Sequence, residues 1–186
     1  FGLGLSCLRK LWIGGEFGLN LDISVAEVIR SLRMKVDQVR QAELLAILGI
    51  DAEWRMHCLS EGQRARVQIF LGLRQEKPLI LLDEVSAHLD VVMRADFLSW
   101  LKRVSFYNGI TVVYATHIMD GLMGATNALS AGIRTQGAPE TWPTHVLWLG
   151  FGAKYKILKA EAMAHEVATA GGLACLCERW IREGRA

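Results

Sequence analysis

The sequence predicts an α/β fold, in which a parallel sheet is covered by helices on both faces. Two continuous apolar runs, residues 79–82 and 110–114, have the length and composition of fully buried strands. Segments with a helical period, residues 60–73 and 91–107, alternate with these runs. Because parallel strands need crossover connections, this alternation predicts a parallel sheet.

The residues before this alternation predict two short helices. Residues 1–21 are rich in glycine and show no clean period, so we expect no regular element there. Ser24 and Glu27 form a capping box, which predicts a helix over residues 24–35. A second amphipathic segment, residues 37–48, ends at Gly49, the residue type that most often follows a helix.

The residues after His117 show weaker patterns. Residues 121–140 are rich in small and polar residues without periodicity, which predicts a long loop. Residues 145–149 predict a third strand, residues 155–158 a further one, and residues 159–170 a terminal helix. Residues 175–182 are consistent with one or two more amphipathic turns.

Composition limits the possible function classes. The chain has 186 residues, 52% of them hydrophobic, with 21 basic and 19 acidic side chains, so its charge requires neither nucleic acid nor an anionic membrane as a partner. No apolar run is long enough to span a bilayer, so we expect no membrane insertion. Cys7, Cys58, Cys175 and Cys177 lack zinc-ligand spacing, and we expect small buried side chains in a reducing, cytosolic compartment.

Two carboxylates follow the first predicted strand. Asp83 and Glu84 come directly after residues 79–82, and α/β sheets bind their ligands outside the carboxyl ends of the strands. An aspartate there can hold Mg²⁺, and the next carboxylate can polarise an attacking water. The alternative is an ordinary acidic turn after a strand.

A second candidate site lies at the start of the helix over residues 60–73. Ser60 and Gln63 form a capping box, and Gly62 leaves room for a ligand to approach the backbone. The free N–H groups and the dipole of a helix start attract anions, so this segment predicts a phosphate site. The alternative is an ordinary helix cap.

His117 and Asp90 complete the candidate residues. His117 follows the strand over residues 110–114, so it can reach a ligand at the same sheet edge and contact a phosphate or a water. Alternatively it is a polar loop residue. Asp90 directly precedes the helix over residues 91–107 and is well placed to cap it.

Together, in this order and at these distances, the residues resemble the ATP-binding-cassette (ABC) ATPases. Residues 59–63 are similar to the LSGGQ signature, 79–84 to Walker B, 86–90 to the D-loop, and His117 to the switch histidine. The resemblance implies a P-loop NTPase fold with ATP and Mg²⁺ held between two head-to-tail cassettes. It implies that Asp83 binds the metal and that Glu84 and His117 are catalytic. It also places Ser60, Gly62, Gln63 and Asp90 at a nucleotide, and makes the partner a second cassette, identical or not.

The chain is most similar to the soluble ABC ATPases of subfamily I, which include one associated with the carbon-catabolite-repression/NOT transcription complex. The phrases at residues 54–57, 114–122 and 142–145 are typical of that group. The resemblance implies a non-transporter, dimeric ATPase in the cytoplasm, and also in the nucleus, that serves a transcription or mRNA-regulatory complex.

The sequence departs from the family pattern in four respects. It contains no G-x-x-x-x-G-K-[ST] phosphate loop, so we expect that part to lie upstream of Phe1 and the 186 residues alone to be inactive. Glu61 replaces a glycine of the signature, and Val85 stands where proline is common. Residues 123–141 separate segments that the family joins almost directly, which indicates an insertion.

These features predict the C-terminal portion of an ABC-type nucleotide-binding domain at residues 1–160. Residues 21–60 would form its helical subdomain, residues 60–122 would run from the signature to the switch histidine, and residues 161–186 would be a helical tail. Two alternatives stay open: a degenerate cassette that pairs but does not hydrolyse ATP, and the ATP-binding subunit of an ABC transporter.

Overall fold

The computed structural model describes residues 10–13, 21–32, 36–118, 143–149, 155–171 and 173–185. The chain forms two compact units, which divide between Ile118 and Met119. The predicted insertion at residues 123–141 lies outside the described residues.

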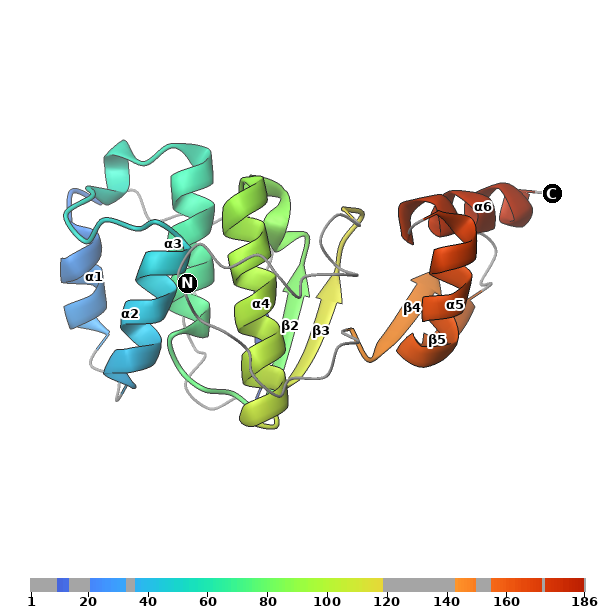
Figure 1. Cartoon of the computed structure of the whole chain (residues 1–186). Coiled ribbons are helices and arrows are strands. Elements are labelled where there is room, and N and C mark those ends of the chain that lie inside the picture. The colour runs from blue at the N-terminus through green and yellow to red at the C-terminus, as the bar shows by residue number, and fades with distance from the viewer. Residues whose placement is uncertain are drawn as a thin grey trace. The chain divides into compact units, whose positions relative to one another are not determined.

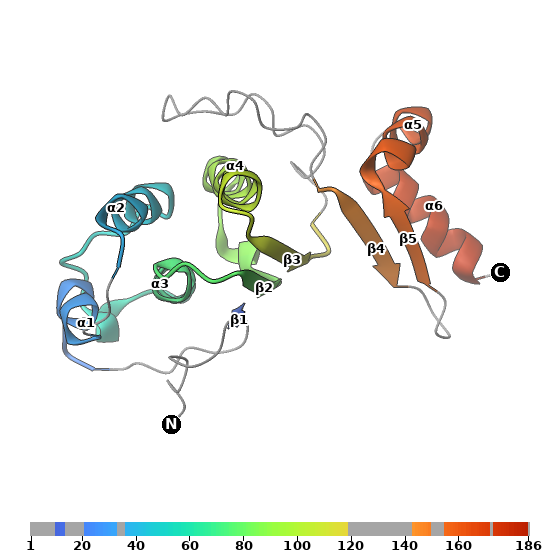
Figure 2. The ribbon, with the colours of Figure 1, turned by 90° about the horizontal axis from the view of Figure 1, so that it is seen from below.

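The N-terminal unit contains a parallel sheet of three strands in the order β1 (Lys10–Ile13), β2 (Leu79–Asp83) and β3 (Thr111–Ala115). Figure 1 shows β2 beside β3, and Figure 2 shows β1 as well. The register pairs Leu79 with Lys10 on one side and with Thr111 on the other. The predicted parallel sheet is therefore confirmed. The expectation of no regular element in residues 1–21 is wrong at β1, because this short strand depends on pairing with the distant β2 rather than on a local period.

Helices α3 (Glu61–Leu73) and α4 (Val91–Tyr107) lie on the same side of this sheet (Figure 2). Ile80 and Leu82 are buried, whereas Val113, which alternates to the opposite face, is 52% exposed. Cover on both faces is thus not seen within the described residues. The apolar runs did not predict this exposed face, because a strand that is apolar at every position can have one buried face or two.

Three further helices of the N-terminal unit are α1 (Val25–Ser31), α2 (Gln38–Ile47) and the 3₁₀ helix η1 (Met56–Cys58). The predicted capping box begins α1, because Ser24 Oγ accepts from the backbone N–H of Glu27 at 3.2 Å and the Ser24 N–H donates to the Glu27 carboxylate at 2.6 Å. α1 ends at Ser31, earlier than predicted. α2 ends before Gly49, whose φ of +54° is the left-handed conformation expected there.

Buried and half-buried arginines tie these helices together by donating to carbonyls at helix ends. Arg40 of α2 donates from Nε to the Leu73 carbonyl at 2.8 Å, and Arg66 of α3 donates to the Leu48 carbonyl at 3.1 Å. The last carbonyls of a helix have no partner within it, so a neighbouring cation both satisfies them and favours the negative end of the dipole.

The C-terminal unit contains an antiparallel hairpin followed by two helices. Strands β4 (His145–Leu149) and β5 (Tyr155–Lys159) pair along their full length, and α5 (Ala160–Ala170) and α6 (Leu173–Arg185) follow. The predicted strand at residues 145–149 exists, but it pairs with β5 in a sheet of its own. In α6, Leu176 and Trp180 are buried.

The cysteines differ from the expectation of uniform burial. Cys177 is buried, and burial raises the pKa of its thiol. Cys58 and Cys175 are exposed, so that expectation is wrong for both, and Cys7 lies outside the described residues. None of the helices in the described part of the chain is long and apolar enough to cross a membrane.

Candidate functional site

The two carboxylates lie at the carboxyl end of β2. Asp83 is the last residue of the strand and is exposed, and the N–H of Glu84 donates to the Ala115 carbonyl at 3.0 Å, which continues the pairing with β3. Glu84 itself has a φ of 52°, and it is the one non-glycine residue with positive φ among the described residues. A non-glycine residue in this conformation is uncommon, and such strain clusters at functional sites.

The structure brings Glu84 and His117 together. His117 Nδ1 lies 2.7 Å from Glu84 Oε2, although the two residues come from the ends of different strands. The parallel pairing of Asp83 with Ala115 places both strand ends at one edge of the sheet. The side chains of Glu84 and His117 are 43% and 74% exposed, although Glu84 Oε2 itself is buried, so a ligand or a water can reach the pair only at its other atoms.

Asp83 suits a metal ion that takes its other ligands from elsewhere. The described ranges contain no group of three His, Cys, Asp or Glu side chains that could hold a metal ion by themselves. Mg²⁺ is commonly held by one or two carboxylates together with waters and substrate phosphates. The exposed oxygens of Asp83 fit that mode as a single protein ligand.

The helix start at Ser60 forms as predicted. Ser60 Oγ accepts from the N–H of Gln63 at 3.2 Å, and the Ser60 N–H donates to Gln63 Oε1 at 2.9 Å. Each of these side chains therefore serves the helix cap. Gly62 leaves the backbone of the first turn of α3 uncovered, with the His88 carbonyl as its nearest neighbour, 3.9 Å from where a Cβ would lie.

We expect Gly62→Ala to leave the fold intact and to weaken any ligand that approaches this backbone. The new methyl group meets the His88 carbonyl only at ordinary contact distance. Alanine in a helix is about 0.5–1 kcal/mol more favourable than glycine, so the melting temperature should stay equal or rise. ATP-induced association of complete cassettes, measured by sedimentation, should weaken. A drop in melting temperature would instead give Gly62 a structural role.

Asp90 is the N-cap of α4. Its Oδ1 accepts from the N–H of Met93 at 2.8 Å, and the side chain is exposed. The predicted cap is confirmed, and a contact between Asp90 and nucleotide stays a prediction.

Side-chain contacts that the sequence did not predict hold the turn after Glu84 (Val85–His88, η2). The Tyr114 hydroxyl of β3 donates to Ser86 Oγ, which is buried. Arg94 of α4 donates to the Leu89 carbonyl at 3.1 Å. Burial raises the pKa of Tyr114, so the phenol stays protonated as a donor. No local pattern signals these contacts, because each joins two different elements.

We expect Tyr114→Phe to destabilise the N-terminal unit by about 1 kcal/mol, because Ser86 Oγ loses its partner in a buried place. Urea denaturation measures the effect. A double-mutant cycle with Ser86→Ala isolates the pair, and additive losses would contradict the hydrogen bond.

Comparisons with known proteins show which families the chain is similar to. A family model described as "AAA domain, putative AbiEii toxin, Type IV TA system" matches residues 32–123. ABC transporter I family member 20 of Arabidopsis thaliana is 36% identical over 92% of this chain and 46% of its own length. CCR4-associated factor 16 of Saccharomyces cerevisiae is 46% identical over 56% of this chain and 36% of its own length. An ABC transporter solved in an inward-facing conformation matches the fold with a TM-score of 0.55 at 22% identity, over 90% of this chain and 62% of that one.

The fold is that of a P-loop NTPase of the ABC cassette class. The chain is homologous to ABC ATPase domains, and its relatives include the ABC transporter I family proteins of Arabidopsis and CCR4-associated factor 16 of yeast. It spans about half the length of the plant relatives, 46% and 57%.

Proposed function

We propose that this chain is part of a non-transporter ABC ATPase that binds and hydrolyses ATP as a dimer of cassettes. The observation that supports this most directly is the Glu84–His117 pair, 2.7 Å apart at the ends of two adjacent parallel strands. A carboxylate that is both accessible to water and oriented by a histidine is suited to act as a general base.

In this proposal each residue at the sheet edge has one role. Asp83 helps to hold Mg²⁺, which would neutralise charge on the β- and γ-phosphates. Glu84 orients the attacking water or takes its proton. His117 contacts the γ-phosphate and, through its ring nitrogen at 2.7 Å, fixes the direction of the Glu84 carboxylate.

The helix start at Ser60 serves the nucleotide of the partner cassette. Ser60, Gly62 and Gln63 surround the uncovered first turn of α3, whose N–H groups and dipole attract a phosphate. Asp90 lies at the start of α4 after the η2 turn, where it would contact the nucleotide across the dimer. The partner cassette is a second copy or a related chain.

The biological setting rests on the relatives. The yeast relative is named as a CCR4-associated factor, and we propose by analogy that this chain serves a transcription or mRNA-regulatory complex in the cytoplasm and nucleus. We further propose that residues 1–160 form the ATPase part, with residues 21–60 as helical subdomain and 60–122 as the signature-to-switch segment. Residues 123–141 would be an insertion and 161–186 a helical tail.

An ATPase assay tests the proposal. Because the sequence has no phosphate loop, the chain is joined in cis to the part of the Arabidopsis relative that it does not match. We expect Mg²⁺-dependent release of phosphate that EDTA abolishes and that added lipid vesicles do not change. ATP-dependent dimers without turnover would favour a pairing module, and turnover that requires a membrane subunit would favour a transporter. A chain that shows no ATP binding and no ATP-induced association would overturn the proposal.

A further inference from the structure

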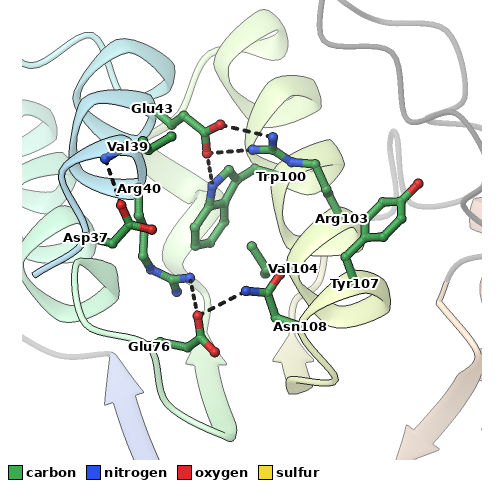
Figure 3. Close-up of a pocket in the computed structure, with 10 residues that line it drawn as sticks. All are labelled: Asp37, Val39, Arg40, Glu43, Glu76, Trp100, Arg103, Val104, Tyr107 and Asn108. Atoms are coloured by element: carbon green, nitrogen blue, oxygen red, sulfur yellow. Dashed lines mark hydrogen bonds and ion pairs between the residues drawn. The ribbon is translucent and has the colours of Figure 1, made fainter.

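A pocket of about 300 Å³ lies between α2, α4 and the loop after α3, and it is lined by residues that have no part in the proposed ATP site (Figure 3). We call it the Arg40 pocket. Trp100 and Val104 of α4 provide its apolar wall, and Arg40 of α2 and Glu76 of the loop provide polar groups. Its size is at the lower end for small-molecule sites, which combine an apolar wall with a few fixed polar groups.

Arg40 has an unsatisfied donor. The residue is only 6% exposed, its Nε donates to the Leu73 carbonyl at 2.8 Å, and its guanidinium carbon lies 4.8 Å from the centroid of the Trp100 ring. Its Nη2 is buried and has no hydrogen-bond partner. A buried donor without an acceptor is unfavourable and uncommon. A ligand that brings an acceptor would therefore satisfy a group that the chain itself leaves unpaired.

The other guanidinium of the pocket is already satisfied. Arg103 donates to both carboxylate oxygens of Glu43, at 3.0 and 2.7 Å, and the indole N–H of Trp100 donates to the same carboxylate at 3.3 Å. This bidentate pair fixes the wall of the pocket and leaves little charge for a ligand.

The remaining charges favour a neutral ligand with both an acceptor and a donor. Two exposed carboxylates, Glu76 and Asp37, lie at the rim of the pocket, and Glu76 Oε2 is 3.9 Å from Arg40 Nη1. Because Arg103 and Glu43 neutralise each other, these two carboxylates and the Arg40 guanidinium leave the pocket with one negative charge in excess. An anion would meet both carboxylates, and a cation would meet the guanidinium groups. The Glu76 carboxylate, which accepts from the Asn108 amide at 3.0 Å, can accept from a further N–H.

We propose that the Arg40 pocket binds a carboxamide attached to a flat apolar group. The amide oxygen accepts from Arg40, the amide N–H donates to Glu76, and the apolar group packs against Trp100 and Val104. The same chemistry is offered by a small aromatic amide and by a glutamine side chain of a polypeptide. This proposal does not depend on ATP hydrolysis.

Three fragments of one shape and different charge test the proposal. Benzamide, benzoate and benzamidinium are titrated into the 186-residue chain, and the indole N–H resonance of Trp100 is followed by NMR after assignment with Trp100→Phe. We expect saturable binding of benzamide with a dissociation constant on the order of millimolar, about tenfold tighter than for either charged fragment. N-acetylglutamine methylamide forms the second arm. If N-acetylglutamine methylamide binds as tightly as benzamide or more tightly, the ligand is a polypeptide. If it binds more weakly than benzamide, the ligand is a small molecule.

Two variants link the binding to the named groups. Arg40→Lys keeps the charge but removes the Nη2 donor, so benzamide should bind about tenfold more weakly. Glu76→Gln removes the excess negative charge at an exposed position and should narrow the preference for benzamide over benzoate, even if Arg40→Lys does not fold. Arg55→Lys, at an exposed arginine that does not line the pocket, is the control. The proposal would be overturned if either charged fragment binds as tightly as benzamide. It would also be overturned if benzamide causes no saturable shift of the Trp100 indole resonance.

Discussion

In a complete cassette, Glu84→Gln should lower kcat for ATP hydrolysis by about 10²–10⁴-fold, the usual contribution of a general base. The amide keeps the size of the side chain, but it cannot take a proton from water. ATP affinity should change little, because the carboxylate acts on the attacking water and not on the nucleotide. Single-turnover phosphate release and equilibrium ATP binding, measured on one preparation, separate the two effects.

The matched control for this variant is Glu53→Gln, at an exposed residue in the loop between α2 and η1. It makes the same chemical change outside the candidate site, so it should leave turnover unaltered. If Glu84→Gln retains turnover while Glu53→Gln behaves as wild type, Glu84 is not the base and the acidic turn is merely structural. If Glu84→Gln loses ATP binding as well, the carboxylate serves the nucleotide or its metal.

Ser60→Arg should abolish ATP-induced dimerisation of complete cassettes and leave ATP binding by the monomer unchanged. The exposed Ser60 lies at the positive end of the α3 dipole, where a long cationic side chain blocks the approach of a phosphate to the backbone N–H groups. Sedimentation in saturating ATP, in the Glu84→Gln background that preserves bound nucleotide, measures the dimer.

Ser60→Ala separates this role from that of a helix cap. Loss of the cap costs about 1 kcal/mol of stability, which a thermal melt detects, and dimerisation should weaken much less than in Ser60→Arg. A dimer that persists in the Ser60→Arg protein would rule out contact between this helix start and the partner's nucleotide.

Several elements were predictable because their signals are local. The capping boxes at Ser24 and Ser60 and the cap at Asp90 join residues three positions apart, and the structure forms each of them. The bounds of α4, Val91–Tyr107, agree with the predicted range residue for residue. A helix is stabilised by contacts within one or two turns, so its ends can be inferred from neighbouring residue types.

The candidate site was predictable only as a set of residues. The order of Asp83, Glu84 and His117 indicated one ligand site, but their spacing gave no distance between any two of them. The 2.7 Å contact of Glu84 with His117 follows from the parallel register of β2 and β3. The contact of Tyr114 with Ser86 follows from the same pairing, and the motifs that contain the two residues did not predict it.

By itself, then, the sequence determined the class of fold, the helices with their caps, and the residues that could carry chemistry. The tertiary structure alone decided that residues 10–13 form a strand, that β4 and β5 form a separate antiparallel sheet, and that Arg40 is buried with an unpaired Nη2. The physical reason is that strand pairing and the burial of a long polar side chain depend on residues far apart in the chain. Such contacts exist only after the helices and strands have packed, so no local window of sequence contains them.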